Sequence, residues 1–174
     1  MHHRIFVFSI VATAAALSGC GAESSSSKGS NDSPFDDLFD TPTSDPTPDS
    51  MYGVWAVANE NDDIKVDGRY KLEESAVTMA ARCTYSDGSP TVTVGIEVAA
   101  TVDDNAISIR ESKTEQKASG KYFCRASITP LSVKNCAESN TPSNFRKSCF
   151  VLDGTEIELY GDAGEKAVWT KVSD

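Results

Sequence analysis

The chain has 174 residues, and its formal net charge is −10 because 26 acidic side chains outnumber 16 basic ones. It has no basic stretch of the kind that neutralises nucleic-acid phosphates, so we expect no nucleic-acid partner. Both histidines, His2 and His3, lie within the first three residues. A domain that begins later therefore has no imidazole for Ser-His-Asp or Cys-His catalysis, and we predict a protein that is not an enzyme and needs no cofactor.

The first 19 residues have the layout of an export signal. A short basic-leaning head that ends at Arg4 is followed by apolar or small residues over 5–17 and by Ser18 and Gly19. This order is typical of a secretory signal peptide. The apolar run is shorter than the roughly 20 residues that a membrane-spanning helix needs. We therefore predict a signal peptide over 1–19.

Residues 20–50 form a low-complexity stretch dominated by Ser, Thr, Pro, Asp and Gly. Such a composition buries too little apolar surface to offset the entropy of ordering the chain. We predict a disordered acidic tether with a root-mean-square reach of roughly 30 Å. One island, FDDLF at 35–39, interrupts the pattern. It has the composition of a short docking motif, but we favour the simpler interpretation that it belongs to the acidic tether.

From residue 51 onward, apolar and polar residues alternate in short stretches separated by turn signals. The stretches lie at 51–58, 69–72, 76–85, 91–102, 106–111, 121–129, 148–152, 155–160 and 166–172. Alternation with period two predicts half-buried β-strands, and Asp67-Gly68 and Asp153-Gly154 are typical turn pairs. The polar region 111–119 fits a helical turn or a strand extension, and we expect 130–147 to be mostly loop.

This pattern predicts one all-β domain over 51–174. Eight or nine short strands with regular turns are typical of an antiparallel barrel or a barrel-like sandwich. Closure into a barrel would also remove the exposed strand edges through which sheets aggregate.

Five cysteines divide into one and four. In an exported domain, the even set Cys83, Cys124, Cys136 and Cys149 predicts two disulfides, with three possible pairings. The spacing lacks the close cysteine pairs of zinc sites, and the stretch at 59–67 lacks the turn glycine and closing glutamate of a calcium loop. We therefore predict no metal site. Cys20 is left unpaired at the end of the predicted signal.

The residues Leu17-Ser18-Gly19-Cys20 resemble the lipobox of bacterial lipoproteins. The resemblance implies cleavage before Cys20, a diacylglycerol thioether on its sulfur and acylation, for example by palmitate, of its new amino group. Several acyl chains give stable membrane anchoring, which a single chain does not. Gly21 follows the cysteine in place of an aspartate, and in diderm organisms this implies the outer membrane. We therefore expect a lipid-anchored protein of the cell envelope.

Two further resemblances concern the domain. Gly53-Val54-Trp55 resembles the Gly-x-Trp start of lipocalin-type barrels, in which the tryptophan closes one barrel end and a cation, here Lys171 or Lys166, covers it. This implies a barrel interior that holds a small apolar ligand. The alternative is an interior filled by the protein's own side chains.

The segment Ser119-Gly120-Lys121-Tyr122 resembles the inhibitory segment of the membrane-bound inhibitors of c-type lysozyme, which are small lipoproteins with eight-stranded barrels. The serine-to-tyrosine spacing is one residue shorter here, and the family's second element is absent. The leading expectation is therefore a lipocalin-like barrel that binds a small apolar ligand or an envelope protein. The alternative is an envelope protein inhibitor or surface-interaction module, with 130–147 as its projecting loop.

Overall fold

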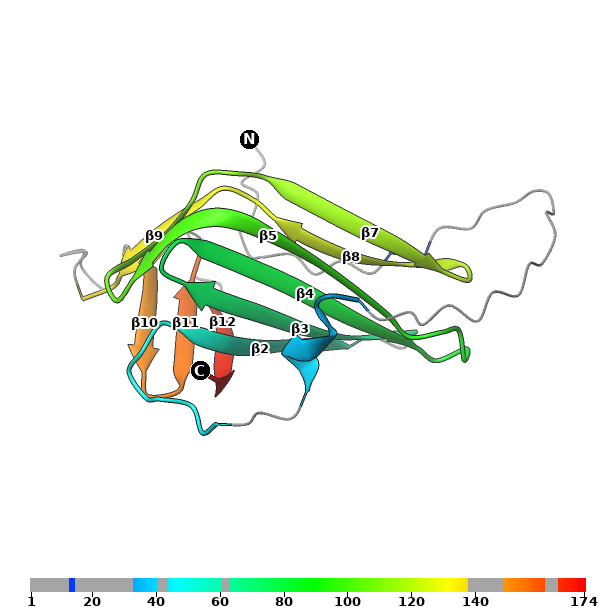
Figure 1. Cartoon of the computed structure of the whole chain (residues 1–174), viewed down its shortest axis with the longest axis horizontal. Helices are drawn as coiled ribbons and strands as arrows, with labels where there is room; N and C mark the ends of the chain where they lie inside the picture. The colour runs from blue at the N-terminus through cyan, green and yellow to red at the C-terminus, as the bar shows by residue number, and fades with distance from the viewer. Residues whose placement is uncertain (1–12, 15–32, 41–43, 61–62, 138–148, 162–165) are drawn as a thin grey trace.

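The computed structural model describes residues 13–14, 33–40, 44–60, 63–137, 149–161 and 166–174, and its regular structure is nearly all β (Figure 1). A short 3₁₀ helix, η1 (Asp36–Phe39), precedes the barrel strands. The strands are β1 (Thr13–Ala14), β2 (Gly53–Glu60), β3 (Ile64–Glu73), β4 (Ala76–Tyr85), β5 (Val92–Asp103), β6 (Ala106–Ile109), β7 (Lys113–Ser119), β8 (Tyr122–Ile128), β9 (Leu131–Asn135), β10 (Cys149–Asp153), β11 (Glu156–Tyr160) and β12 (Lys166–Ser173).

Nine of these strands close into one barrel, which confirms the predicted fold class. Their order is β10–β11–β12–β2–β3–β4–β5–β6–β9, with β9 returning to β10. Neighbouring strands are antiparallel except β9 and β10, which run parallel and, among the described residues, pair at Lys134–Cys149 and Asn135–Phe150. An odd number of strands cannot alternate in direction all the way round a closed ring, so one parallel pair is required. This seam is the point at which the barrel departs from the expected antiparallel arrangement.

The core follows from alternation along the long strands. In β4, Val77, Met79, Ala81 and Cys83 are all fully buried on the inner face, and the register places Met79 between Tyr70 of β3 and Ile96 of β5. Each large apolar side chain buried in this way contributes roughly 1.5–3 kcal/mol to folding.

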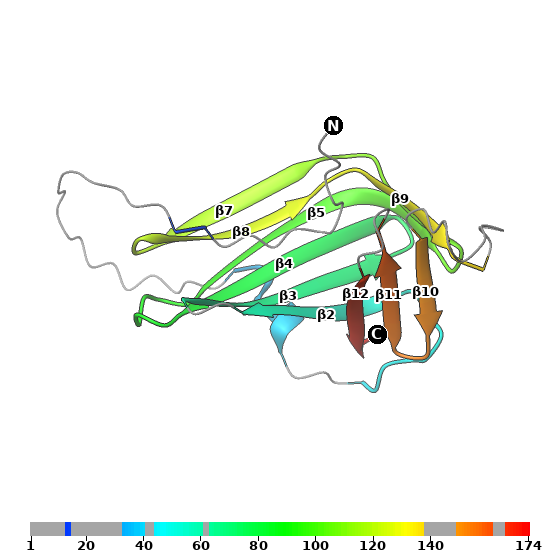
Figure 2. The ribbon, with the colours of Figure 1, turned by 180° about the vertical axis from the view of Figure 1, so that it is seen from behind.

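β7 and β8 form a hairpin that is not part of the closed barrel. This hairpin packs against β4 and β5, on the face of these strands that builds the core. Within β5, only the last residues, Ala100–Asp103, pair with the barrel strand β6, while β8 lies against the earlier part of β5 (Figures 1 and 2). Every second residue of β8 is buried, and Cys124 of β8 is bonded to Cys83 of β4. The two-residue strand β1 pairs with Tyr122 and Phe123 of β8, and it belongs to the predicted signal peptide.

Two local predictions are wrong. Asp67-Gly68, predicted as a turn, lies inside β3, where Gly68 pairs with Val57 and Ala81 on the buried face. Tertiary pairing there overrides the local turn signal. The predicted loop at 130–147 contains β9, and its remainder from 138 lies outside the described residues. The polar region 111–119 contains the strand β7, which is exposed except at Ser119.

Candidate functional site

The structure brings Gly53, Trp55 and Lys171 together at one end of the barrel. Lys171 on β12 pairs with Trp55 on β2, and its Nζ lies 5.8 Å from the centre of a Trp55 ring. The Trp55 ring is fully buried, and its Nε1 donates a hydrogen bond to the Met51 carbonyl at 3.0 Å. Lys166, the other candidate, lies at the start of β12, where it is exposed and pairs with Glu158.

The buried ammonium of Lys171 interacts with two oxygen atoms, one from the segment before β2 and one from the residue that follows β12. It donates to the Thr47 carbonyl at 2.9 Å and forms an ion pair with Asp174 at 2.6 Å. The hydrogen bond from Lys171, together with hydrogen bonds from Thr47, lowers the pKa of Asp174 to about 2. Burial of a lysine is tolerated only when it is paired and hydrogen-bonded in this way.

Gly53 is required by the close approach of β12. Its φ is +123°, a backbone conformation that favours glycine. A Cβ at this position would overlap the carbonyl oxygen of Ser173 and lie 2.7 Å from the Lys171 side chain. The glycine therefore lets the last strand and its lysine close over the tryptophan.

Large side chains occupy the barrel interior. Tyr70 and Trp169 stack with ring centres 4.3 Å apart, and Trp55, Phe150 and Met79 are also at most 2% exposed. On the described surface, one groove of about 340 Å³ lies outside this end of the barrel, between Tyr52, Lys71, Glu74 and Asp174.

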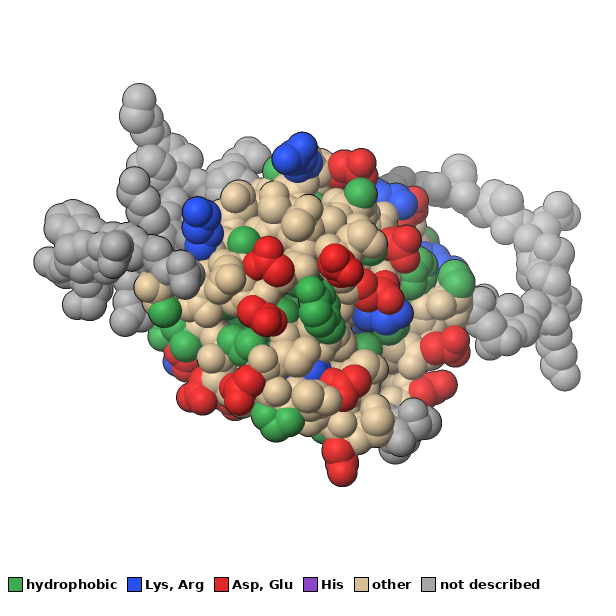
Figure 3. Space-filling view, turned by 60° about the vertical axis from the view of Figure 1, so that its left-hand side comes forward, with side chains coloured by type: hydrophobic (Ala, Val, Ile, Leu, Met, Phe, Trp, Pro, Cys, Tyr) green, Lys and Arg blue, Asp and Glu red, His purple; other side chains and the backbone are tan. Residues whose placement is uncertain are grey.

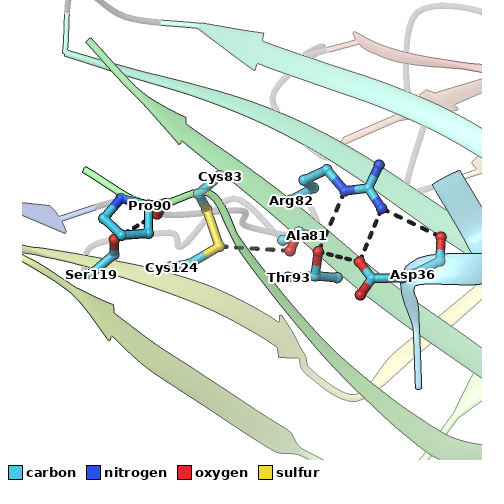
Figure 4. Close-up of a disulfide and its surroundings, with 8 residues drawn as sticks. All are labelled: Asp36, Ala81, Arg82, Cys83, Pro90, Thr93, Ser119 and Cys124. Carbon is cyan, nitrogen blue, oxygen red and sulfur yellow. Dashed lines mark hydrogen bonds and ion pairs between the residues drawn. A yellow bond between two sulfur atoms is a disulfide. The ribbon is translucent and has the colours of Figure 1, made fainter. Parts of the chain in front are cut away.

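The cysteines form the disulfides Cys83–Cys124 and Cys136–Cys149, which confirms two pairs and selects one of the three possible pairings. The first bond attaches β8 to β4 (Figure 4). The second lies at the seam between β9 and β10. Cys20 lies outside the described residues.

Ser119 and Tyr122, the residues that resemble an inhibitory segment, face inward. Tyr122 is 2% exposed and stacks on Tyr85 with ring centres 4.9 Å apart. The Ser119 hydroxyl is buried and donates to the Pro90 carbonyl at 2.6 Å (Figure 4). Between them, Gly120 adopts a φ of +58° in the turn from β7 to β8. These contacts account for both side chains as parts of the fold.

The structure also shows a contact that the composition of the tether did not predict. Residues 33–40, called here the docked segment, lie on the outer face of β3–β5 (Figure 1). They contact a surface that we call the cradle, formed by Arg69, Ala80, Arg82, Thr93 and Gly95.

The carboxylate of Asp36 is held by two strands. Its Oδ1 accepts hydrogen bonds from the Thr93 hydroxyl at 2.6 Å and from the Arg82 guanidinium at 2.9 Å (Figure 4). Its Oδ2 accepts from the backbone N–H of Ser33 at 2.7 Å. These interactions, with the Thr93 hydrogen bond first among them, lower the pKa of Asp36 below its usual value.

Two aromatic rings flank this carboxylate. The Phe35 ring occupies the space that a side chain at Gly95 would fill. The Phe39 ring lies under two guanidinium groups, 4.3 Å from Arg82 and 5.3 Å from Arg69. Cation–π contacts at exposed sites contribute about 0.5–1 kcal/mol each.

The docking is shallow. No residue of η1 is buried, and the Asp36 and Arg82 side chains are 33% and 29% exposed, so their ion pair contributes at most about 1 kcal/mol. Ordering each backbone residue costs about 1–2 kcal/mol. The docked segment is therefore held by a few specific contacts of marginal net strength.

The chain is tied to the barrel again before β2 begins. Thr47 contacts Asp174 and Lys171, and the backbone of Asp49 donates to the Gly154 carbonyl at 2.9 Å while its side chain accepts from Gly154. Both ends of this stretch, at 33–40 and at 47–49, thus contact the folded domain.

No protein-family model, curated protein or solved structure matches this chain.

Two acidic residues beside turns, Asp103 and Glu73, make contacts within the fold. Asp103 accepts hydrogen bonds from the backbone of Asn105 and Ala106, each at 2.8 Å, and so shapes the turn into β6. Glu73 pairs with Lys71 at 2.7 Å. Among the described residues there is no group of three or more His, Cys, Asp or Glu side chains placed to hold a metal ion. In Figure 3, acidic side chains are spread over one face and outnumber basic ones.

In the part of the chain that the structure describes, no helix has the length and apolar character needed to cross a membrane.

Proposed function

We propose that this chain is a lipid-anchored protein of the cell envelope that binds a partner through the outer surface of its barrel and catalyses no reaction. The anchor is inferred from Leu17-Ser18-Gly19-Cys20 and from the low-complexity stretch behind it. Cleavage before Cys20 and acylation would leave several acyl chains on one residue, which is enough for stable membrane attachment.

The observation that carries the surface mode of binding is the packing of the barrel interior. Trp55, Tyr70 and Trp169 are buried within the described part of the barrel, in the region where a lipocalin-like carrier would need a few hundred Å³ of accessible volume for its ligand. This packing of the described interior supports the outside of the barrel as the surface that binds a partner.

A lipocalin-like carrier is the second candidate, favoured by the meeting of Gly53, Trp55 and Lys171 at the barrel end. The two candidates make different predictions for apolar probes. If the protein binds its partner through the surface, fatty acids and an environment-sensitive dye should not bind at a saturable site. The thermal midpoint of the protein should then be the same with and without these probes. One saturable site of any such probe that also stabilises the protein would favour the carrier.

The anchor has a separate test. Cells grown with radiolabelled palmitate should label the wild-type chain and leave Cys20→Ser unlabelled and released from membranes. Cys136→Ser is the matched control because it also removes one sulfur, yet its product should remain labelled. Membrane retention of the Cys20→Ser chain would contradict lipid anchoring at this residue.

A further inference from the structure

We propose that the outer face of β3–β5 is a peptide-binding site for a short aromatic–acidic segment, and that residues 35–39 of the tether are its resident ligand. Each of the three ligand groups, two aromatic rings and one carboxylate, contacts a different part of the cradle. Gly95 accepts the first ring, Arg82 and Thr93 bind the carboxylate, and the two guanidinium groups of Arg69 and Arg82 cover the second ring.

The cradle is formed by the sheet and not by the ligand. Arg69, Arg82 and Gly95 lie on strands that pair with one another through continuous registers and whose opposite faces build the core. Glycine inside a strand weakens it and often marks a close approach of another group. The ring of Phe35 is the group that approaches Gly95, and beside it Ala80 supplies only a methyl group to the floor.

The contacts define a recognition pattern. Asp36 is bound by Arg82 and Thr93, whereas the neighbouring Asp37 is exposed. The rings at the first and fifth positions of the segment, Phe35 and Phe39, both contact the cradle. The ligand class is therefore aromatic–Asp–x–x–aromatic, with the acidic residue next to the first ring providing charge complementarity to the guanidinium groups.

The site holds its ligand reversibly. The docked segment has no buried residue in η1, so it can leave without opening the core. A segment tethered so close to its site has an effective concentration of roughly millimolar. A second polypeptide with the same pattern must therefore compete with it, and we assign such a peptide as the partner that fits this face.

One consequence rests on the proposed lipid anchor. With the segment docked, the free tether runs from Cys20 to Ser33, and about 13 residues of this composition reach roughly 20 Å. Displacement of the segment by a partner lengthens the tether toward the roughly 30 Å expected for its full length. Binding at the cradle would thus move the barrel away from the membrane.

The first test measures docking in the full chain solubilised in detergent, whether or not Cys20 is acylated. The readout is amide hydrogen exchange of residues 33–40, in which Asp36 and Leu38 donate backbone hydrogen bonds within the segment. We expect Asp36→Asn to speed exchange there by about tenfold or more, whereas Asp37→Asn leaves it unchanged. Equal exchange in the two variants would overturn the proposal.

Gly95→Ala tests the same site from the barrel side, with Thr101→Ala, an exposed residue of the same strand, as its control. Loss of protection at 33–40 in Gly95→Ala alone, with β3–β5 amides still protected, supports the site. Retained protection in Gly95→Ala contradicts it. Because Asp36→Asn lies outside the barrel, that pair of variants still decides the question if Gly95→Ala fails to fold.

The second test measures binding in trans. A fluorescent peptide with the sequence of residues 33–40, SPFDDLFD, should bind saturably to the double variant Phe35→Ala/Phe39→Ala, whose cradle is empty. The wild-type chain should bind it at least about tenfold more weakly, because its own segment competes. A peptide with Asn in place of the first Asp should also bind at least about tenfold more weakly. Absence of saturable binding, or equal binding of the two peptides, would refute the site while leaving the lipid anchor to its own test.

Discussion

Cys136 and Cys149 are bonded to each other across the one parallel seam of the barrel, with their Cα atoms 5.1 Å apart. Within the described residues, β9 and β10 share two residue pairs there, supplemented by a hydrogen bond from the Cys136 backbone to the Phe150 carbonyl at 2.8 Å. The covalent bond thus reinforces the least extensive strand pairing in the ring.

Replacement of both seam cysteines by alanine should therefore open the barrel locally. The bond closes a loop with a sequence separation of 13, and loss of such a cross-link costs about 3 kcal/mol of unfolding free energy. Urea unfolding measures this loss, and hydrogen exchange should locate the faster opening in β9 and β10. The pair Cys83→Ala/Cys124→Ala is the comparison, since its opening should be confined to β8. Unchanged exchange at the seam would contradict this assignment.

Lys171→Met should destabilise the barrel by about 1–3 kcal/mol, because it removes charge-assisted hydrogen bonds to Thr47 and Asp174. Lys166→Met, in the same strand but exposed, should change the free energy of unfolding by at most about 0.5 kcal/mol. Chemical denaturation of both variants makes the comparison. If the two substitutions cost the same, Lys171 has no special role at the barrel end.

Gly53→Ala should cost more than Gly154→Ala. Both positions have positive φ, but an added Cβ overlaps the Ser173 carbonyl oxygen only at Gly53, and at Gly154 it meets open space. The left-handed backbone alone costs a non-glycine residue about 1–2 kcal/mol. The difference between the two thermal midpoints then reports the steric overlap at Gly53 together with its φ of +123°, which lies outside the left-handed region that Gly154 occupies at +58°, and equal midpoints would argue against a close approach of β12.

Tyr122→Ala should unfold or strongly destabilise the domain, by about 3–5 kcal/mol, because it leaves a cavity beside Tyr85. Lys121→Ala, at the adjacent exposed position, should be nearly neutral. Thermal unfolding distinguishes the variants. A stable Tyr122→Ala protein would show that the ring is not a core residue and would reopen its comparison with an inhibitory segment.

The contact between Asp174 and Lys171 should weaken in strong acid, where Asp174 becomes protonated. The pKa of Asp174 is lowered from 3.8 to about 2 in the folded protein, so its stabilising effect is full above pH 3.8 and is lost as the pH falls through about 2. An NMR titration of the Asp174 carboxyl and the Thr47 amide follows this. In Lys171→Met the pKa should rise toward 3.8, and an unchanged pKa would assign the shift to other groups.

The sequence predicted the strands best where alternation is strong and both neighbours are long strands. The structure begins and ends β4 at the predicted residues, 76–85, because its apolar side chains lie on one buried face. β9 was missed because it is short and buries only Val133. Its pairing with β6 and β10 depends on residues far away in the chain.

Part of the candidate site could likewise be predicted from the sequence, and part could not. The resemblance to lipocalin-type barrels predicts that Gly53, Trp55 and Lys171 meet at one barrel end, and the structure places them together. The docked segment could not be predicted from composition, because its acidic residues resemble those of any solvated tether. The segment is held in place by the space above Gly95 and by two arginines, Arg69 and Arg82. All three residues lie more than 25 residues away along the chain. The FDDLF island itself was the available signal.

The pairing of β12 with β2 has a consequence for how the protein acquires its structure. The register joins Lys171 to Trp55 and Thr170 to Ala56, so the first barrel strand finds one of its two partners only when the last strand has been made. Contacts between such distant parts of a chain form slowly. A growing or translocating chain can assemble the β2–β5 meander early, but Trp55 stays uncovered until β12 has been made. The barrel can therefore close only after β12 is available, and a chain interrupted before β12 would expose an aromatic surface and two open edges.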